Sequence, residues 1–299
     1  MADETRDQTT HDAADTLSRR DFVTLGVAAG IAAATASGAA AGHEVIETEV
    51  TIKTPDGSCE AAFSYPTGGG AHPAVIIWTD AFGLRPSMRD MARRVASEGY
   101  AVLVPNPFYR VAKAPVIADL TVFSFSNTTD RAKLTQLMGS IGAEGAAERD
   151  AVAFVNWLDA QKQVDKTKKI GTQGYCMGGP LVMRTAAALP NRVGAVGSFH
   201  GGGLVTATPT SPHLLIPKMR ARFYVGIASN DDSRQPEAKD VLKAAFAAAK
   251  RPAEIEVYKS LHGWCVPDMP ADANGPIYNK PEAEKAWAKL MALYKTALA

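Results

Sequence analysis

The chain has 299 residues, of which 46% are apolar and 21% charged, and its formal net charge is +1. This is the composition of an ordinary globular protein, and the near-neutral balance gives no general electrostatic reason to expect a nucleic-acid or anionic-membrane partner. The length suits one large domain or two small ones, and we find no internal repeat of solenoid length.

The first forty residues differ in character from the rest of the chain. A polar stretch leads into the segment SRRDFV at residues 18–23, which contains the pair Arg19 and Arg20. An uncharged, alanine-rich run follows and ends in small residues at 37–42. This pattern resembles a twin-arginine export signal, and the alternative is an anchoring or buried helix. We therefore expect residues 1–42 to be removed and residues 43–299 to be a periplasmic or secreted domain without a stable membrane anchor.

From residue 45 onward, short apolar or alternating runs alternate with longer helical patterns, which favours an α/β fold. The turn Pro55-Asp56-Gly57 predicts an antiparallel hairpin formed by the first two runs. The predicted strands are residues 45–53, 60–65, 74–78, 101–104, 169–172, 193–199, 222–227 and 254–258. The predicted helices are residues 89–98, 143–161, 177–189, 236–249 and 281–298. Residues 111–142 show no clear pattern and are expected to cover the site. We expect a mainly parallel sheet between helices in one domain, because no linker-like stretch interrupts the alternation.

The segment around Cys176 is the strongest local signal for chemistry. It reads GTQGYCMGG at residues 171–179, between a predicted strand and a predicted helix. A nucleophile elbow needs this arrangement, because Gly174 and Gly178 let the chain approach itself closely at a sharp turn. The following helix N-terminus favours the thiolate form of a cysteine. The structural alternative is a glycine-rich turn with an incidental buried cysteine.

Two later segments supply candidates for an acid and a base. Asp231 and Asp232 follow a predicted strand directly, and His262 follows the last strand after a short loop. Each has a structural alternative: Asn-Asp-Asp is good turn chemistry, and a lone histidine is often structural. The order nucleophile, acid, histidine is that of an α/β-hydrolase triad. We favour Asp231 over Asp232 as the acid because it lies closer to the strand end.

Three segments together resemble the dienelactone hydrolase (carboxymethylenebutenolidase) family of α/β-hydrolases. They are WTDAFGL at 78–84, GYAV at 99–102 followed by Pro105, and GYCMGG at 174–179. The resemblance runs from the first hairpin to the last helix, and the cysteine elbow combined with Phe82-Gly83 is its most discriminating part.

The resemblance implies a reaction and a role for each site residue. Cys176 attacks a carbonyl carbon, while His262, oriented by the aspartate, takes the proton and returns it. The backbone N–H groups of Ala81 and Met177 form the oxyanion hole. Asp80 stands where the family has a glutamate that interacts with the resting thiol. The implied substrate is a small ester or lactone, and no metal or organic cofactor is expected.

Other residues suggest how a substrate is held. Phe82, His200 and Trp264 are candidates for the pocket, joined in an apolar set by Trp78, Phe108 and Tyr109, although aromatics at such places are equally often core. Arg85 and Arg110 are the nearest cations to the motifs. Dienelactone-cleaving members of the family carry an arginine shortly after the histidine. Residues 263–267 contain none, which argues against dienelactone itself as the substrate.

Some questions stay open from the sequence. Cys59 and Cys265 either pair in an oxidising compartment or remain two small unpaired residues. A thioester or amide hydrolase with the same triad is one functional alternative, and a catalytically silent binding protein of the same fold is another. The natural substrate and the oligomeric state are not encoded in any motif that we identify.

Overall fold

The computed structural model describes residues 42–272 and 274–299, and Gly42–Ala299 group as one compact unit. Apart from Gly42, the predicted export signal lies outside the described residues. Among the described residues, no helix combines the length and the apolar character needed to cross a bilayer.

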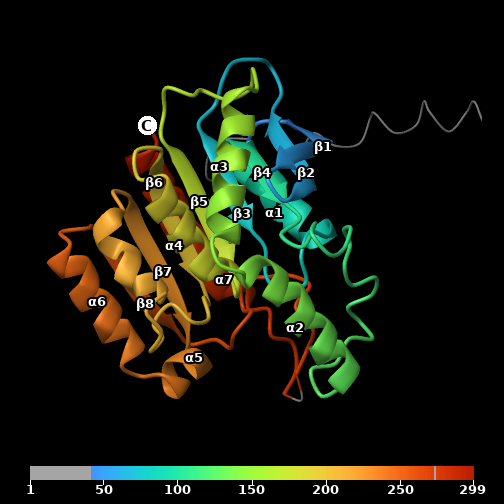
Figure 1. The fold of residues 1–299 in the computed structure, drawn as a ribbon, viewed down its shortest axis with the longest axis vertical. Coiled ribbons are helices and arrows are strands. Elements are labelled where there is room, and N and C mark those ends of the chain that lie inside the picture. The colour runs from blue at the N-terminus through green and yellow to red at the C-terminus, as the bar shows by residue number, and fades with distance from the viewer. Residues whose placement is uncertain (1–41, 273) are drawn as a thin grey trace, which may run out of the picture. The chain divides into compact units, whose positions relative to one another are not determined.

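An eight-stranded sheet forms the centre of the protein, in the order β1-β2-β4-β3-β5-β6-β7-β8 (Figure 1). β1 and β2 form the predicted antiparallel hairpin, and β2 also pairs antiparallel with β4. The strands from β4 to β8 in this order are parallel. The strands are β1 (Val45–Thr54), β2 (Gly57–Pro66), β3 (Ala74–Trp78), β4 (Ala101–Pro105), β5 (Ile170–Tyr175), β6 (Val193–Phe199), β7 (Arg222–Ala228) and β8 (Ala253–Tyr258).

Helices cover both faces of this sheet, as the apolar strand sequences predict. The helices are α1 (Pro86–Ser97), α2 (Thr128–Gly142), α3 (Ala146–Asp159), α4 (Gly178–Ala188), α5 (Ser229–Arg234), α6 (Ala238–Ala248) and α7 (Lys280–Ala297), with a 3₁₀ helix at Pro212–Lys218. Successive side chains of β3 point to opposite faces: Ile76 packs in a cluster with α3 and α4, whereas Ile77 packs in a cluster with α1 and α7. The predicted mainly parallel sheet between helices, with an N-terminal antiparallel hairpin, is confirmed.

The segment 111–142, which has no clear pattern, contains a helix that the sequence analysis did not predict. α2 begins after Asn127, whose side chain accepts hydrogen bonds from the N–H groups of Thr129 and Asp130. The helix predicted over residues 143–161 begins later, at Ala146, because Gly145 has a left-handed φ of 70° and separates α2 from α3. The helical pattern of α2 is hard to recognise because only Leu134, Leu137 and Ile141 are buried.

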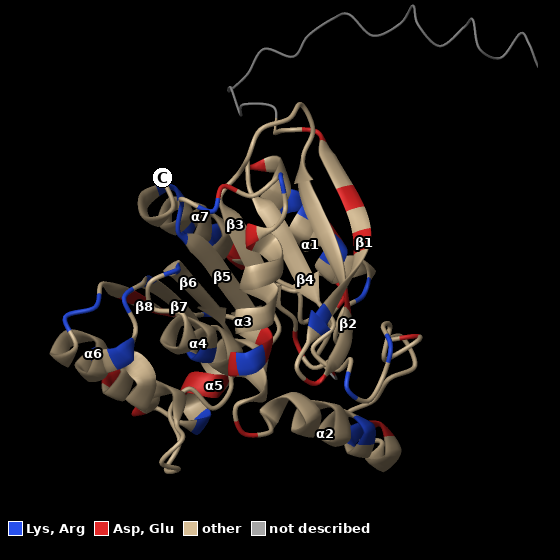
Figure 2. Ribbon diagram, turned by 45° about the horizontal axis from the view of Figure 1, so that its top comes forward, with Lys and Arg blue, Asp and Glu red and all other residues tan. Residues whose placement is uncertain are grey.

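Ion pairs fasten the edge strand β1 to the helix above it. Glu47 and Glu49 on β1 bind Arg89, and Glu47 also binds Arg93. Figure 2 shows these acidic and basic positions on β1 and α1. Charged side chains along an edge strand disfavour pairing with a further strand.

Candidate active site

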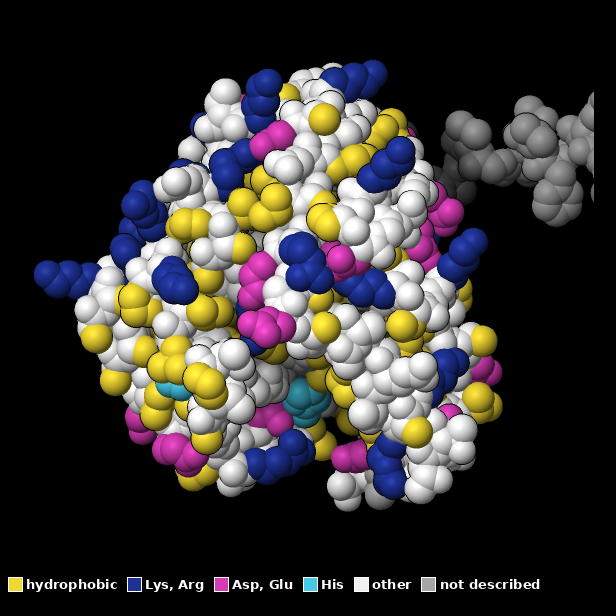
Figure 3. Space-filling view, in the orientation of Figure 1, with side chains coloured by type: hydrophobic (Ala, Val, Ile, Leu, Met, Phe, Trp, Pro, Cys, Tyr) yellow, Lys and Arg dark blue, Asp and Glu magenta, His cyan; other side chains and the backbone are white. Residues whose placement is uncertain are grey.

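The parallel strands place the candidate triad and oxyanion residues at the carboxyl ends of the strands. Asp80 and Ala81 follow β3, Cys176 follows β5, Asp231 lies just after β7, and His262 follows β8. Because parallel strands all end on the same side, Asp80 and His262, which are 182 residues apart in sequence, both lie there. In the space-filling view, a histidine side chain lies within a hollow bordered by apolar and acidic side chains, between the areas where Figure 1 places α5 and α2 (Figure 3).

The turn at Cys176 has the strained geometry that the sequence pattern predicts. Cys176 has a φ of 53°, in the left-handed region that non-glycine residues rarely adopt. A Cβ atom on Gly174 would lie 2.2 Å from the carbonyl oxygen of Gly178, and one on Gly178 would lie 2.5 Å from that of Trp78. Only glycine fits at either position. The elbow is therefore packed directly against the end of β3, where the segment with Asp80 and Ala81 begins.

His262 contacts both the carboxylate and the thiol. Its Nδ1 lies 2.6 Å from Oδ2 of Asp231, and the Cys176 thiol is close enough to the ring to raise its pKa. Its backbone N–H donates to Oδ1 of Asn230 at 2.9 Å, which fixes the loop that carries the ring. With Nδ1 on the carboxylate, the ring bridges an acid and a sulfur, the arrangement that general-base activation of a thiol requires.

The two adjacent aspartates have different partners. Asp231 lies in the first turn of α5 and contacts His262, while Asp232 binds Nζ of Lys239 at 2.7 Å. In this geometry only Asp231 orients the histidine.

The surroundings of His262 favour its protonated form. Burial lowers the pKa of the ring, but hydrogen bonds and charge interactions with Asp231 and Cys176 outweigh burial and raise the pKa of His262 to about 10. An imidazolium beside a cysteine sulfur stabilises the thiolate, which is the nucleophilic form.

Two backbone N–H groups beside the elbow have no acceptor among the described residues. The N–H of Met177 follows the nucleophile directly, and the N–H of Ala81 lies in the turn after β3. Backbone donors without a protein acceptor are available to a developing oxyanion. The neighbouring Gly83 and Gly179 N–H groups, in contrast, donate to the carbonyls of Asp80 and Cys176.

The hydrogen bonds of Asp80 go to groups other than the thiol. Both carboxylate oxygens bind the Arg85 guanidinium, at 2.7 and 2.9 Å, and Oδ1 also accepts from the N–H of Phe82. Arg85 in turn binds Asp268 through two nitrogens. Asp80 is 1% exposed and Arg85 only 3%. The carboxylate is therefore held by Arg85, and the contact with Cys176 that its expected role requires is not among its hydrogen bonds.

The three candidate pocket residues fall into two places. The His200 ring lies between those of His262 and Trp264, with centroids 4.7 Å (His200–His262) and 5.2 Å (His200–Trp264) apart. His200 and Trp264 are almost entirely buried. Phe82 packs instead against Phe123 and Phe125, at 5.0 and 6.0 Å, in the segment before α2. Phe82 thus links the expected oxyanion loop to the segment predicted to cover the site.

The rest of the apolar set belongs to the core rather than to a ligand pocket. Trp78 is fully buried and donates a hydrogen bond to Thr185, and Phe108 is likewise buried. Tyr109 contacts Asp150 and Thr54 through its hydroxyl group.

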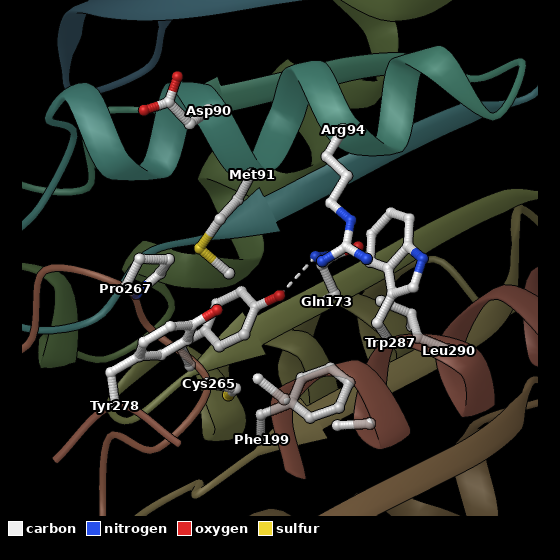
Figure 4. A pocket seen from close by; sticks show the side chains of 13 residues that line it. Asp90, Met91, Arg94, Gln173, Phe199, Cys265, Pro267, Tyr278, Trp287 and Leu290 are labelled. Atoms are coloured by element: carbon white, nitrogen blue, oxygen red, sulfur yellow. Dashed lines mark hydrogen bonds between the residues drawn. The ribbon is translucent and has the colours of Figure 1, made fainter. Parts of the chain in front are cut away.

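A separate cavity of about 140 Å³ lies away from Cys176 and His262, between α1 and α7 (Figure 4). Gln173 forms part of its wall and donates to the hydroxyl of Tyr175 at 2.7 Å. Cys265 also lines this cavity. Nearer the triad, a hollow of about 200 Å³ is bordered by Asp231, Asp232 and the glycines at 201–203.

The three cysteines are free in the structure. Cys59 and Cys265 are buried in different apolar clusters, on opposite faces of the sheet, so they form no disulfide. In the described part of the chain, no group of three or more histidine, cysteine, aspartate or glutamate side chains is arranged to hold a metal ion.

Two site features escaped the sequence analysis. Asn230 holds the His262 loop through a hydrogen bond. It directly precedes the predicted acid, Asp231, and this position is the only sequence feature that could have indicated its role. His200 accepts a hydrogen bond from the backbone of Cys176, a contact that no sequence pattern indicates.

Comparisons with known proteins identify the family of the chain. The profile of the Dienelactone hydrolase family matches residues 60–298. A putative carboxymethylenebutenolidase of Escherichia coli (strain K12) is 26% identical over 266 residues, covering 82% of this chain and 90% of the relative. A carboxymethylenebutenolidase of Rhodococcus opacus is 28% identical over 216 residues, covering 70% of this chain and 78% of the relative.

A solved structure shares the fold. The crystal structure of a putative dienelactone hydrolase from Klebsiella pneumoniae subsp. pneumoniae MGH 78578 superposes with a TM-score of 0.69 at 21% identity, covering 85% of this chain and 99% of that one. The predicted α/β-hydrolase fold is therefore confirmed. Since the family profile spans most of the chain, the protein belongs to the dienelactone hydrolase family and is a hydrolase of ester or lactone bonds.

Proposed function

We propose that the protein hydrolyses a small ester or lactone through a cysteinyl acyl-enzyme, with Cys176 as nucleophile, His262 as base and Asp231 as the orienting acid. The observation that carries this proposal is the position of His262 between the Asp231 carboxylate, 2.6 Å away, and the Cys176 thiol. A nucleophile, a base and an orienting acid in this order can activate the sulfur and shuttle its proton.

The reaction proceeds in two halves. In the first, the Cys176 sulfur attacks the carbonyl carbon, and the N–H groups of Ala81 and Met177 stabilise the resulting oxyanion. Each such donor typically contributes about 3 kcal/mol. The C–O bond then breaks, and His262 gives its proton to the leaving oxygen. In the second half, water attacks the thioester while His262 takes one of its protons. The acid is then released, and Cys176 leaves as the thiolate beside protonated His262.

The substrate that we propose is neutral near the reacting carbonyl. Arg85 is occupied by Asp80 and Asp268, and Arg110 by Asp56 and Asp150. Neither of these cations is therefore available to bind a substrate carboxylate. This supports an uncharged ester or lactone over dienelactone, which carries a carboxylate.

Hydrolysis assays of the full chain test the proposal. The panel contains aryl acetates, simple lactones, a dienelactone, a thioester and an anilide, and is run with the wild type and with Cys176→Ala. Cys59→Ala is the matched control, since it removes a buried cysteine outside the site. We expect turnover by the wild type and the control, none by Cys176→Ala, and a mass increase of one acyl group on the Cys176 peptide.

The panel also separates the alternatives. Preferential cleavage of the thioester or anilide would reassign the substrate while keeping the triad. Equal turnover by Cys176→Ala would show that hydrolysis occurs elsewhere and would refute the proposed nucleophile.

We also propose that the enzyme is exported by the twin-arginine route. Arg19 and Arg20, the uncharged run after them and the small residues at 37–42 support this. Replacing both arginines by lysine should leave the enzyme in the cytoplasmic fraction, whereas unchanged export would exclude the twin-arginine route.

A further inference from the structure

His200 has an unusual backbone conformation beside the nucleophile. It follows β6 with a φ of 41°, in the left-handed region, and it is 1% exposed. Its own N–H donates to the carbonyl of Gly226 at 2.8 Å, which ties the residue to the neighbouring strand β7. A non-glycine residue keeps such a conformation only where the surroundings impose it, and such positions cluster at functional sites.

A hydrogen bond joins this residue to the backbone of Cys176. The Cys176 N–H donates to Nδ1 of His200 at 3.1 Å and also approaches the carbonyl of Phe199 at 3.1 Å. Two residues with left-handed backbones, Cys176 and His200, are thus linked across adjacent strands. The bond locates the proton of His200, because a ring nitrogen that accepts carries none. The neutral ring must therefore carry its proton on Nε2.

The surroundings keep the His200 ring neutral, so that its Nδ1 can accept a hydrogen bond. Burial and the neighbouring His262 hold the pKa of His200 well below its usual range. The ring thus remains neutral at pH 7 and adds no positive charge beside His262. Its Nε2 is buried without a hydrogen-bond partner among the described residues, so no polar contact there competes with the bond at Nδ1.

We infer that His200 is a positioning residue, which fixes the direction of the Cys176 thiol by accepting the Cys176 N–H and packs against the His262 ring. This inference rests on the proposed role of Cys176 as nucleophile. His200 touches neither the sulfur nor the substrate in this scheme; it acts by holding the strained backbone from which the sulfur projects.

Two substitutions separate the hydrogen bond from the packing. His200→Phe keeps a ring against His262 and Trp264 but has no acceptor. His200→Asn keeps an acceptor oxygen two bonds from Cβ, as Nδ1 is, and asparagine tolerates the left-handed region. The readouts at pH 7 are the alkylation rate of the Cys176 peptide with iodoacetamide, kcat and KM for an aryl acetate, and the thermal midpoint of unfolding. Cys176→Ala supplies the background.

We expect His200→Phe to lower the alkylation rate and kcat about tenfold with KM little changed, since a tenfold change corresponds to about 1.4 kcal/mol, which is within the range for a lost hydrogen bond. His200→Asn should keep the alkylation rate within about threefold of the wild type. If both variants lose alkylation rate and kcat equally, and in proportion to the fall in their thermal midpoints, His200 has only a structural role. Wild-type rates in His200→Phe would overturn the inference.

A measurement on the wild type keeps the inference testable even if the variants do not fold. ¹⁵N-correlated NMR of the histidine rings reports the tautomer, and we expect His200 to be neutral with its proton on Nε2. A proton on Nδ1 would refute the inference. The two proposals also fail differently. If no ester is hydrolysed but Cys176 alkylation still follows the expected pattern, only the proposed function fails.

Discussion

Replacing Gly174 by alanine tests the close approach of strand and helix at the elbow. The new Cβ would lie 2.2 Å from the carbonyl oxygen and 2.5 Å from the carbonyl carbon of Gly178, and 3.0 Å from Cγ1 of Val182. The first two are backbone atoms and cannot rotate away, so β5 and the start of α4 must separate. Overpacking of this kind costs about 1–3 kcal/mol. The lower entropy of the unfolded alanine variant offsets about 0.4–1 kcal/mol.

The net loss of about 1–2 kcal/mol should lower the thermal midpoint by about 2–8 °C for a domain of this size. The effect on catalysis should be larger, because a shift of about 1 Å in a reacting group costs about a hundredfold in rate. Differential scanning calorimetry and aryl acetate hydrolysis measure the two effects.

Gly139→Ala is the matched control. Gly139 lies within α2, and no heavy atom lies within 4 Å of its added Cβ. We expect it to stabilise the protein by up to about 1 kcal/mol, since alanine is the better helix former, and to keep its activity. If Gly174→Ala unfolds at the wild-type temperature and hydrolyses at the wild-type rate, the steric reasoning about the elbow is wrong.

Three further predictions concern the charged groups. Asp231→Asn should reduce kcat at least a hundredfold whereas Asp232→Asn should stay within about threefold, because only the former contacts the histidine; equal effects would contradict the assignment. The raised pKa of His262, about 10, means that its protonation stabilises the fold fully below its ordinary value near 6.5. The stability difference between the wild type and His262→Gln should therefore shrink as pH rises from about 6.5 to 10, and a constant difference in chemical denaturation would refute this. Arg85→Met should cost about 3–5 kcal/mol, because it leaves a buried carboxylate unpaired. Arg94→Met, at an exposed ion pair, should cost about 1 kcal/mol or less, and similar losses in the two unfolding curves would contradict the argument.

Local sequence patterns were sufficient for most of the fold. The strand at Ala74–Trp78 begins and ends where predicted, because five consecutive apolar residues are bounded by a proline and by polar residues. The helix α2 was missed, because a helix that buries only three side chains has almost no apolar periodicity.

The sequence by itself determined the order of the eight strands and of the five predicted helices, the glycine spacing of the elbow, and the chain order of Cys176, Asp231 and His262. Each of these depends on contacts between residues close in the chain or on the known order of a family. Only the tertiary structure decided that Arg85 binds the Asp80 carboxylate, and that His200 accepts a hydrogen bond from the Cys176 backbone. These partners project from neighbouring loops at the carboxyl ends of the parallel strands. Which side chains meet there depends on the packing of all the strands, and no local pattern encodes it.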